Sequence, residues 1–463
     1  MSVASRLICA GCGAEPAPSE PYPFRCPNAG TDDVDHVLRR ELDLSMLRFP
    51  ADVSEPNSFI RYRTLLHAFH VATEGGMGDE EFCTLVQHLD RQVAALDGHG
   101  FVVTPSARAD ALSDRLGFSA AGGVWVKDET GNVAGSHKAR HLFGVLVYLE
   151  VLERLGRTDP AHRPELAIAS CGNAALAAAV VAAAGGRRLR VFVPVDADPV
   201  VLARLDELGA LISICPRVEG TSGDPTVERL MTAIAAGALP FTCQGNLNGL
   251  AIEGGETLGW ELAAGGIPID RLIVQVGGGA LASACMHAFR EARAFEAIPS
   301  TPRVDTVQTE GAWPLKRAFD AVVAHGGTTA LGYAARHRHE FMRPWEHEPH
   351  SIAHGIIDDE TYDWLAVVEG MLTSRGTPLV VSEKLLHEAN VLARQATGIT
   401  VDATGSAGLA GLIALREAGH IDDDERVALL FTGVDRSVDR KEGAKGAEFS
   451  RPRHPVAERV RAR

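Results

Sequence analysis

VWVKDETGNVAGSHKARHLFGVLVYLEVLERLG (residues 124–156) contains a short apolar strand, a loop with two glycines and a long helical stretch, one directly after the other. The helical stretch ends on a glycine, the residue that most readily adopts a left-handed C-terminal cap. A continuous apolar strand followed by a helix is typical of parallel sheets covered on both faces, in which ligands bind where the strands end. The loop between this strand and helix is therefore a candidate site.

The same alternation continues along the chain. Short apolar runs predict strands at Gly123–Val126, Leu166–Ala169, Arg190–Val195, Leu211–Ile214, Leu272–Val276, Val304–Gln308 and Val427–Phe431. Helical stretches such as NAALAAAVVAAAGG and ALASACMHAFREARAF lie between them, so we expect an α/β fold of two doubly wound domains with parallel sheets. The expected parts are a small cysteine-containing module (1–40), a helical segment (41–100), a catalytic region (101–435) in which a smaller domain (about 140–250) is inserted within the larger, and a charged tail (436–463).

The composition is that of a globular protein, with 46% hydrophobic and 23% charged residues among 463. The net charge of −15 disfavours nucleic acid or an anionic membrane as the main partner, because both attract basic surfaces. The N-terminus lacks the pattern of a signal peptide, and no apolar run approaches the roughly 18 residues of a membrane helix. With eight cysteines and no secretory signal, we expect a cytoplasmic protein with reduced thiols.

Lys138 lies at the start of an expected helix, after two glycines and beside Ser136 and His137. A lysine attacks a carbonyl carbon to form an imine when desolvation or a positive potential lowers its pKa, and a helix N-terminus supplies such a potential. We expect the other five lysines at the surface, namely Lys127, Lys316, Lys384, Lys441 and Lys445. Lys138 is therefore the candidate nucleophile.

A second loop, ASCGNAALAAA, turns from a strand into an alanine-rich helix through Ser170, Cys171, Gly172, Asn173 and Ala174. Backbone N–H groups at such a helix start, together with the Ser and Asn side chains, form a site for a carboxylate. A helix cap followed by small residues for tight packing is the alternative interpretation.

A third loop, LIVQVGGGALASA, places Gly277, Gly278 and Gly279 between a strand and a helix that opens with Ala280 and Leu281. The N–H groups of such a glycine loop hold a phosphate. The run also fits the dinucleotide-binding pattern, but it lies in the middle of the chain, whereas a dinucleotide fold uses that pattern in its first βα unit. We therefore favour phosphate binding.

Thr432 ends the last expected strand, in VALLFTGVD. A hydroxyl there is able to hydrogen-bond a pyridine nitrogen without keeping it protonated, which favours elimination or replacement at the substrate side chain over transamination. Taken alone, Thr432 is equally well interpreted as a turn residue at a strand end.

Cys9, Cys12 and Cys26 form a Cys-x-x-Cys pair with one later cysteine. A structural zinc needs four ligands, and no fourth cysteine lies near Asn28 and Gly30, where it would be expected, although His36 is able to complete the set. We therefore assign no metal site and expect a degenerate zinc ribbon that folds by packing, although zinc binding by these cysteines stays an open question.

These segments together resemble the fold-type II pyridoxal-phosphate (PLP) enzymes, the tryptophan synthase β-like group, and within it threonine synthase and threonine dehydratase. The likeness runs from about Thr104 to Gly433. VWVKDETGNVAGSHKAR resembles the family's cofactor-lysine motif, SCGNAA its substrate loop, VGGGALASA its phosphate loop and ITVDATGSAGLAGL a late segment. His137, Ala139 and the EGGET segment depart from the threonine synthase pattern, and these departures cluster near the substrate side.

The resemblance implies a PLP cofactor attached to Lys138, with a small amino acid as substrate. It implies cofactor contacts from Lys138, Asn173, Gly277, Gly278, Gly279, Ala280, Leu281 and Thr432, and a substrate carboxylate at Ser170, Cys171, Gly172, Asn173 and Ala174. The implied activity is that of a lyase, of the threonine synthase or threonine/serine dehydratase kind, in which Lys138 abstracts the α-proton before β- or γ-elimination. We also expect a homodimer. A β-replacement synthase of the cysteine synthase kind and a non-catalytic PLP-binding protein are the alternatives.

Overall fold

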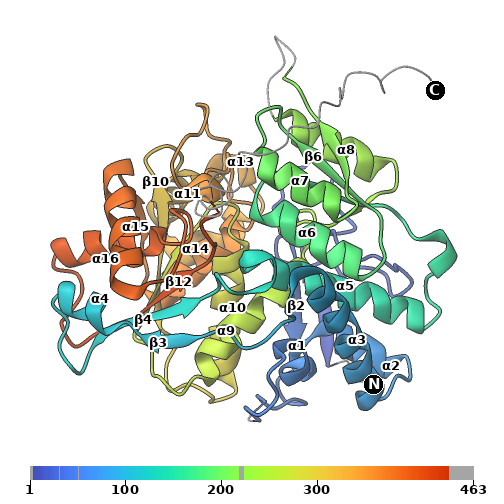
Figure 1. The fold of residues 1–463 in the computed structure, drawn as a ribbon, viewed down its shortest axis with the longest axis horizontal. Coiled ribbons are helices and arrows are strands. Elements are labelled where there is room, and N and C mark those ends of the chain that lie inside the picture. The colour runs from blue at the N-terminus through green and yellow to red at the C-terminus, as the bar shows by residue number, and fades with distance from the viewer. Residues whose placement is uncertain (1–3, 31, 51, 218–223, 437–463) are drawn as a thin grey trace, which may run out of the picture.

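The computed structural model describes residues 4–30, 32–50, 52–217 and 224–436 (Figure 1). The strands are β1 (Ser5–Cys9), β2 (Leu38–Leu42), β3 (Ser106–Arg108), β4 (Gly123–Asp128), β5 (Leu166–Ala169), β6 (Leu189–Val193), β7 (Leu211–Ile214), β8 (Leu239–Pro240), β9 (Arg271–Gln275), β10 (Arg303–Thr309), β11 (Pro378–Val381) and β12 (Arg426–Phe431). The α-helices are α1 (Ser58–Arg61), α2 (His67–Glu74), α3 (Asp79–Asp97), α4 (Asp110–Arg115), α5 (Lys138–Arg154), α6 (Asn173–Ala184), α7 (Pro199–Glu207), α8 (Pro225–Ala235), α9 (Ala251–Ala264), α10 (Ala280–Ala294), α11 (Pro314–Ala324), α12 (Leu331–Ala334), α13 (Arg338–Phe341), α14 (Trp364–Ser374), α15 (Glu383–Thr397) and α16 (Ala407–Glu417).

The larger sheet has the strand order β11-β10-β9-β12-β4-β3 and is parallel except for the edge strand β3. Helices α10 and α14 pack on one face, and α15 and α16 pack on the other (Figure 1). A parallel strand buried on both faces must be apolar at nearly every position, which explains the sequence RVALLF of β12.

The smaller sheet has the order β7-β6-β5-β8 and is parallel throughout. Leu166 and Ile168 of β5 belong to the core that includes α6, whereas Ala167 packs with Leu230 of α8 on the opposite face. This alternation follows from the two-residue period of a strand. The expected α/β fold with parallel sheets is confirmed, while the predicted domain boundaries stay a prediction.

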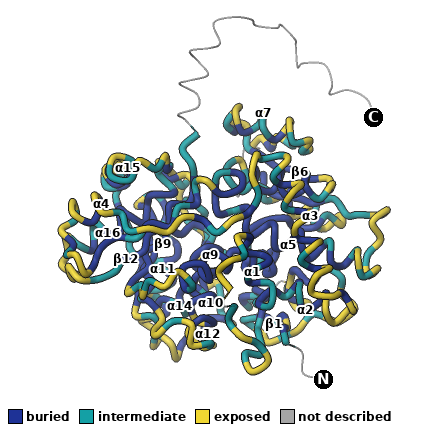
Figure 2. The backbone as a smooth tube through the Cα atoms, turned by 60° about the horizontal axis from the view of Figure 1, so that its bottom comes forward, coloured by how far each residue is buried: buried dark blue, intermediate teal, exposed yellow. Residues whose placement is uncertain are grey.

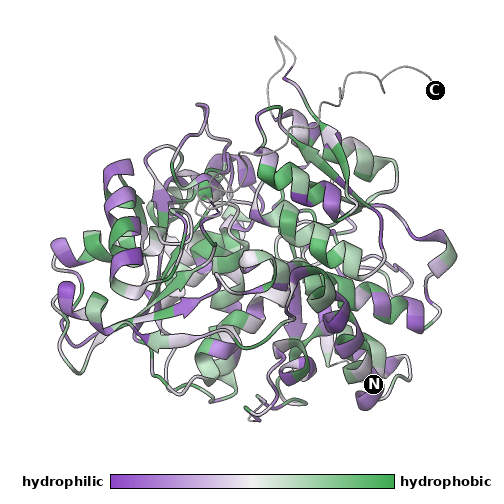
Figure 3. Ribbon diagram, in the orientation of Figure 1, coloured by the Kyte–Doolittle hydropathy of each residue, from purple (hydrophilic) through white to green (hydrophobic). Residues whose placement is uncertain are grey.

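The deepest burial runs along the helices between the two sheets. Figure 2 shows buried backbone concentrated around α5, α9 and β9. Figure 3 shows α6 hydrophobic along its whole length and α15 with both hydrophobic and hydrophilic residues, as expected for a buried and a surface helix. Within the described ranges, no helix combines the length and the apolar character needed to cross a membrane.

Candidate active site

Lys138 is the first residue of α5, and a sharp turn after β4 places it there. The chain turns through Ala134 and Gly135, whose φ angles are 54° and 65°. His137 precedes the helix and gives it no side-chain cap, so the first N–H groups of α5 are not satisfied by a capping side chain. The positive end of the helix dipole therefore lies at the lysine.

Arg140 anchors this end of α5 in the protein core. Its guanidinium forms a two-bond fork with Glu129 (2.8 and 3.0 Å) and also donates to Glu261 of α9. Lys127 belongs to the same network, because its Nζ donates to Glu261 at 2.6 Å and to the Thr104 carbonyl oxygen at 2.7 Å. Burial alone would raise the pKa of Glu261, but Arg140 and Lys127 outweigh it and hold that pKa at about 2.

The expectation that Lys127 is a surface lysine is therefore wrong. Its side chain is only 1% exposed. A buried charge is tolerated when it is ion-paired and hydrogen-bonded, and Glu261 supplies both interactions. No local pattern indicates this partner, which lies 134 positions further along the chain.

Polar atoms without protein partners lie directly beside Lys138. Among the described residues, Ser136 Oγ and His137 Nε2 are buried and make no hydrogen bond. The other ring nitrogen of His137 lies 3.4 Å from the carbonyl oxygen of Thr432, which accepts from it. Burial lowers the pKa of His137 well below its usual value, and Lys138 adds to this effect. Because a buried polar atom without a partner is costly, this site suits a polar ligand.

The glycine loop Gly277–Gly279 leads into α10, which opens with Ala280 and Leu281. A Cβ atom on Gly277 would clash with Asp358 Oδ2, and one on Gly278 would lie 2.7 Å from the ring of Tyr362. Gly279 has a φ of 96°, which favours glycine. The loop is therefore closely covered by the segment that precedes α14.

The carboxyl group of Asp358 lies directly against the glycine loop, and the Gly278 N–H acts to lower its pKa. Desolvation raises the pKa of Asp358 to about 6, and the positive charge of Lys138 acts against this rise. The loop thus offers N–H groups close to Lys138, and we expect it to hold the phosphate of PLP once Asp358 withdraws.

Thr432 directly follows β12, beside the loop that leads to Lys138. Strands β12 and β4 pair in parallel register, with Phe431 opposite Asp128. Gln275, the last residue of β9, donates from Nε2 to Thr432 Oγ1 at 2.6 Å. The parallel arrangement thus places three strand ends at one edge of the sheet, as sequence analysis expected for the ligand site.

The loop Ser170–Ala174 follows β5 and opens α6. Gly172 caps this helix without a side-chain hydrogen bond, and its N–H donates to Ser170 Oγ at 3.5 Å. Cys171 is exposed and Ala174 is half-buried, so the loop borders on solvent. No side chain caps the first N–H groups of α6, which suits a carboxylate ligand.

Two charged residues that sequence analysis did not single out hold Asn173. Arg436 donates from Nη1 to Asn173 Oδ1 and, at 2.6 Å, from Nη2 to the carbonyl oxygen of Ala134. Asp402 accepts a hydrogen bond from the Asn173 side chain. Sequence analysis placed Arg436 in the charged tail, and the rest of that tail (437–463) lies outside the described residues.

Three further residues near Lys138 carried no signal in the sequence. Asp358 and Asp363 lie in a loop without motif or periodicity, and Cys243 approaches the carbonyl oxygen of Lys138 at 3.9 Å. Burial raises the pKa of Asp363 to about 8, although a Gly245 N–H donates to it. The backbone N–H of Asp363 donates to the Gly278 carbonyl oxygen at 3.0 Å, which fixes the glycine loop.

The model of the family "Pyridoxal-phosphate dependent enzyme" (PALP) matches residues 99–433, most of the chain. This chain belongs to that family. The resemblance inferred from the sequence is thereby confirmed, and PLP is its cofactor. The predicted roles of individual site residues stay predictions.

Curated relatives of this family member include threonine synthases. That of Methanocaldococcus jannaschii is 26% identical over 333 residues, covering 71% of this chain and 74% of the relative. That of Mycobacterium leprae is 25% identical over 334 residues, covering 71% and 80%.

Solved structures show the same fold. The processed form of threonine deaminase isoform 2 from Solanum lycopersicum is 15% identical, with 87% of this chain and 98% of that chain covered and a TM-score of 0.56. A diaminopropionate ammonia lyase of Escherichia coli is 16% identical, with 79% and 92% covered and a TM-score of 0.59.

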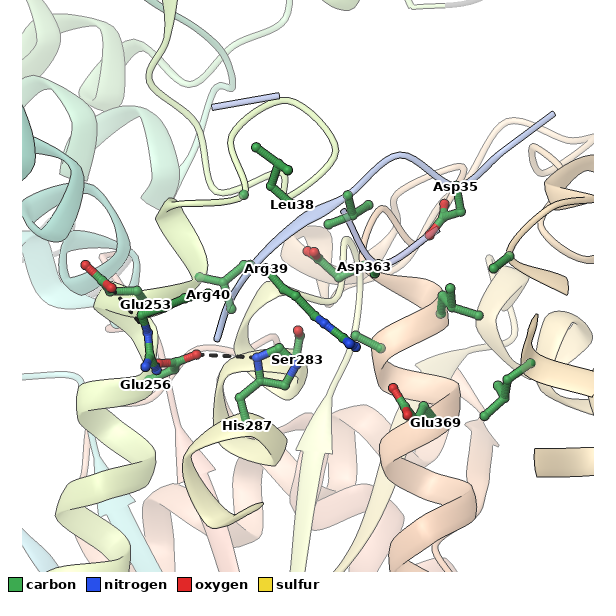
Figure 4. A pocket seen from close by; sticks show the side chains of 18 of the residues that line it. Asp35, Leu38, Arg39, Arg40, Glu253, Glu256, Ser283, His287, Asp363 and Glu369 are labelled. Atoms are coloured by element: carbon green, nitrogen blue, oxygen red, sulfur yellow. Dashed lines mark hydrogen bonds and ion pairs between the residues drawn. The ribbon is translucent and has the colours of Figure 1, made fainter. Parts of the chain in front are cut away.

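A separate cavity of about 150 Å³ lies between β2, α9, α10 and α14 (Figure 4). Arg40 of β2 is buried there and pairs with three carboxyl groups, those of Glu253, Glu256 and Glu291. Burial alone would raise the pKa of Glu256, but Arg40 and His287 hold it at about 2. Burial raises the pKa of Glu253 to about 8 and that of Glu291 to about 7, despite Arg40. The guanidinium of Arg40 therefore keeps only Glu256 strongly acidic. The pKa values of Glu253 and Glu291 stay raised.

Proposed function

We propose that this PLP-dependent enzyme is a lyase that acts on a small amino acid by α-proton abstraction and β- or γ-elimination, as threonine synthases and threonine or serine dehydratases do. One observation carries the proposal. The amine-bearing residue Lys138 opens a helix near Asp358, which lies against the glycine loop, and the ring of the adjacent His137 donates to the Thr432 carbonyl oxygen.

When bound, PLP supplies an electron sink that acidifies the α-carbon of the amino acid. Lys138 would attach the cofactor through Nζ, and the same amine would serve as the base that takes the α-proton and returns a proton later. The N–H groups of Gly277–Gly279 and of the first turn of α10, which starts with Ala280 and Leu281, hold the phosphate. These contacts fix the ring relative to Lys138, so that proton transfer becomes effectively intramolecular.

The substrate carboxylate is assigned to the loop from Ser170 to Ala174. The uncapped N–H groups at the start of α6 supply the donors, and Asn173 is assigned to the oxygen of the cofactor ring, which requires that Arg436 release its side chain. Thr432, a neutral partner, is assigned to the pyridine nitrogen. Because a hydroxyl does not keep that nitrogen protonated, electron withdrawal into the ring is weaker, which favours elimination over transamination.

The relatives support this reaction class. The curated relatives are named threonine synthases, and one solved structure of the same fold is a threonine deaminase. A β-replacement synthase is the second candidate, because the same residues serve it equally, and it differs in requiring a second nucleophile for turnover. The homodimer and the cytoplasmic location stay predictions.

The test is an absorption titration of the PLP-loaded protein with L-serine, L-threonine, O-phosphohomoserine and O-acetylserine, with parallel assays for oxoacid and inorganic phosphate. We expect a visible band that shifts with at least one substrate and product release without an added nucleophile. Lys138→Ala should abolish both the visible band and the release of product. Lys384→Ala, a change at an exposed lysine, should leave both unchanged. Product formation only with an added thiol or amine indicates the replacement synthase. Cofactor binding with no response to any amino acid contradicts an enzymatic role.

A further inference from the structure

Three cysteines and one histidine of the N-terminal module converge on one point. One ligand atom each from Cys9, Cys12, Cys26 and His36 lies within 4.8 Å of all the others. Cys9 ends β1 and Cys12 follows it, Cys26 comes from the next loop, and His36 precedes β2. His36 therefore supplies the fourth potential ligand, in place of the fourth cysteine of a zinc ribbon.

The distances between these atoms are those of a tetrahedral zinc site. With Zn–S bonds of about 2.3 Å and Zn–N bonds of about 2.0 Å, ligand atoms at tetrahedral corners lie roughly 3.5–3.8 Å apart. Cys12 Sγ and Cys26 Sγ are 3.5 Å apart, and Cys9 Sγ and His36 Nδ1 are 3.6 Å apart. A disulfide would instead require about 2.05 Å between two sulfur atoms.

The groups around the four ligands are those that a bound metal needs. Asp32 accepts from His36 Nε2 at 3.0 Å, which leaves the lone pair of Nδ1 directed at the cysteines. The backbone N–H of Asn28 donates to Cys26 Sγ at 3.4 Å, and its side-chain amide donates to Cys12 Sγ at 3.6 Å. Donors of this kind stabilise thiolates, the form in which cysteine binds zinc.

Apolar packing inside the module is too small to replace a metal. Its own core consists of Cys9, Cys26 and Leu38, with Ala14 and Ala29 packed against them. So few apolar side chains bury little surface, and small modules of this size commonly depend on a metal or a disulfide. Leu7 and Phe24 of the module pack instead into the large core of the catalytic body. The expectation of a ribbon that folds by packing stays a prediction, which the zinc measurement below tests.

His36 is also directly connected to the catalytic body. Its neighbour Asp35 is buried and accepts from Trp364 Nε1 at 3.0 Å and from Arg338 Nε at 3.3 Å. Four residues beyond His36, Arg40 enters the carboxyl cluster of α9 and α10 (Figure 4). A metal that fixes His36 therefore fixes the approach of β2 to the larger core.

We propose that Cys9, Cys12, Cys26 and His36 bind one structural zinc ion, which fastens the N-terminal module to the catalytic body. The site has three thiolates, one imidazole and no open position, so its role is structural. It lies apart from Lys138 and does not depend on the reaction that the enzyme catalyses.

Metal analysis of the full-length protein purified under reducing conditions tests this proposal. We expect about one zinc per chain and, after exchange for Co²⁺, the visible absorption of tetrahedral cobalt bound to thiolate. Cys12→Ser loses the zinc, and His36→Ala lowers the zinc affinity about a hundredfold in competition with a chelator. His36→Cys restores it. Cys83→Ser and His88→Ala, changes outside the module, serve as controls with unchanged zinc.

Three results would overturn the proposal. The first is a protein without zinc that also gives no cobalt absorption when Co²⁺ is added to the reduced chain. The second is zinc that survives in Cys12→Ser and His36→Ala as it does in the controls. The third is a Cys12–Cys26 disulfide in the freshly purified protein, detected by mass before reduction. The cobalt titration uses the unaltered chain, so misfolding of a variant does not obscure the answer.

Discussion

Gln275 Nε2 donates a hydrogen bond to Thr432 Oγ1 over 2.6 Å, at the ends of the adjacent strands β9 and β12. The carbonyl oxygens of Gly405 and Leu430 lie 3.1 and 3.2 Å from the same nitrogen, so its two hydrogens are shared among three acceptors. These oxygens only accept, which fixes the orientation of the amide. Thr432 Oγ1 is therefore an acceptor towards Gln275, and its own proton remains for another partner. An unprotonated pyridine nitrogen is such a partner.

Gln275→Leu should weaken PLP binding by about fivefold, because one buried hydrogen bond contributes roughly 1 kcal/mol and 1.4 kcal/mol corresponds to a factor of ten. A fluorescence titration of the cofactor-free protein with PLP measures the affinity. Thr432→Val should cause a similar loss, and the double variant should lose less than the sum of the two free energies. Thr432→Ser keeps the hydroxyl and is the control. Full additivity would show that Gln275 does not act through Thr432.

Asp358→Asn should tighten PLP binding several-fold at pH 8. The pKa of Asp358 is about 6, so at pH 8 its carboxylate is charged and competes with the phosphate for the Gly278 N–H. Below pH 6 the wild-type carboxyl group is protonated, and the difference between the two proteins should shrink. Asp359→Asn, the adjacent and exposed carboxyl group, is the control. If the wild type and Asp358→Asn bind PLP with equal affinity both at pH 8 and below pH 6, Asp358 does not compete with the phosphate for the loop.

Lys127→Met should lower the free energy of unfolding by about 3 kcal/mol, because it removes one partner of a buried ion pair and leaves Glu261 less compensated. Urea unfolding followed by circular dichroism measures the loss. Lys384→Met, at an exposed site, should change stability by less than about 0.5 kcal/mol. If Lys127→Met also lowers the free energy of unfolding by less than about 0.5 kcal/mol, Arg140 alone is sufficient to neutralise Glu261.

Glu253→Gln should flatten the dependence of stability on pH. The folded-state pKa of Glu253 is about 8, above its ordinary value of 4.5, so the folded protein binds this proton more tightly than the unfolded chain does. Stability therefore falls as the pH rises from about 4.5 to about 8. The melting temperature of the variant should exceed that of the wild type at pH 8.5 and approach it near pH 5. Glu388→Gln, on the surface of α15, should reproduce the wild-type curve.

The strands and the cofactor loops could be predicted because each rests on local chemistry. Apolar runs located β5 and β7 to the residue, and glycines after strands located the turns. Five of the described strands were missed. β8 spans only Leu239–Pro240, β3 spans only Ser106–Arg108, and β1 and β2 carry charged residues. The fifth, β11, is the apolar run Pro378–Val381, which was overlooked despite its signal. Lys127, Asp358 and Arg436 were misjudged or missed for a different reason. Each owes its place to a partner far along the chain, which no local pattern indicates.

Strand β12 is among the last described segments of the chain, yet it lies between β9 and β4 in the middle of the larger sheet. Until it is synthesised and inserted, β4 has no parallel neighbour, and the turn that presents Lys138 has no Thr432 beside it. A chain emerging from the ribosome therefore completes the expected cofactor pocket only after β12 has been translated. Pairings between segments so far apart form slowly, since a long loop must close before the contact forms. We accordingly expect a chain truncated before β12 to lose PLP binding, because it lacks both Thr432 and the strand that pairs with β4.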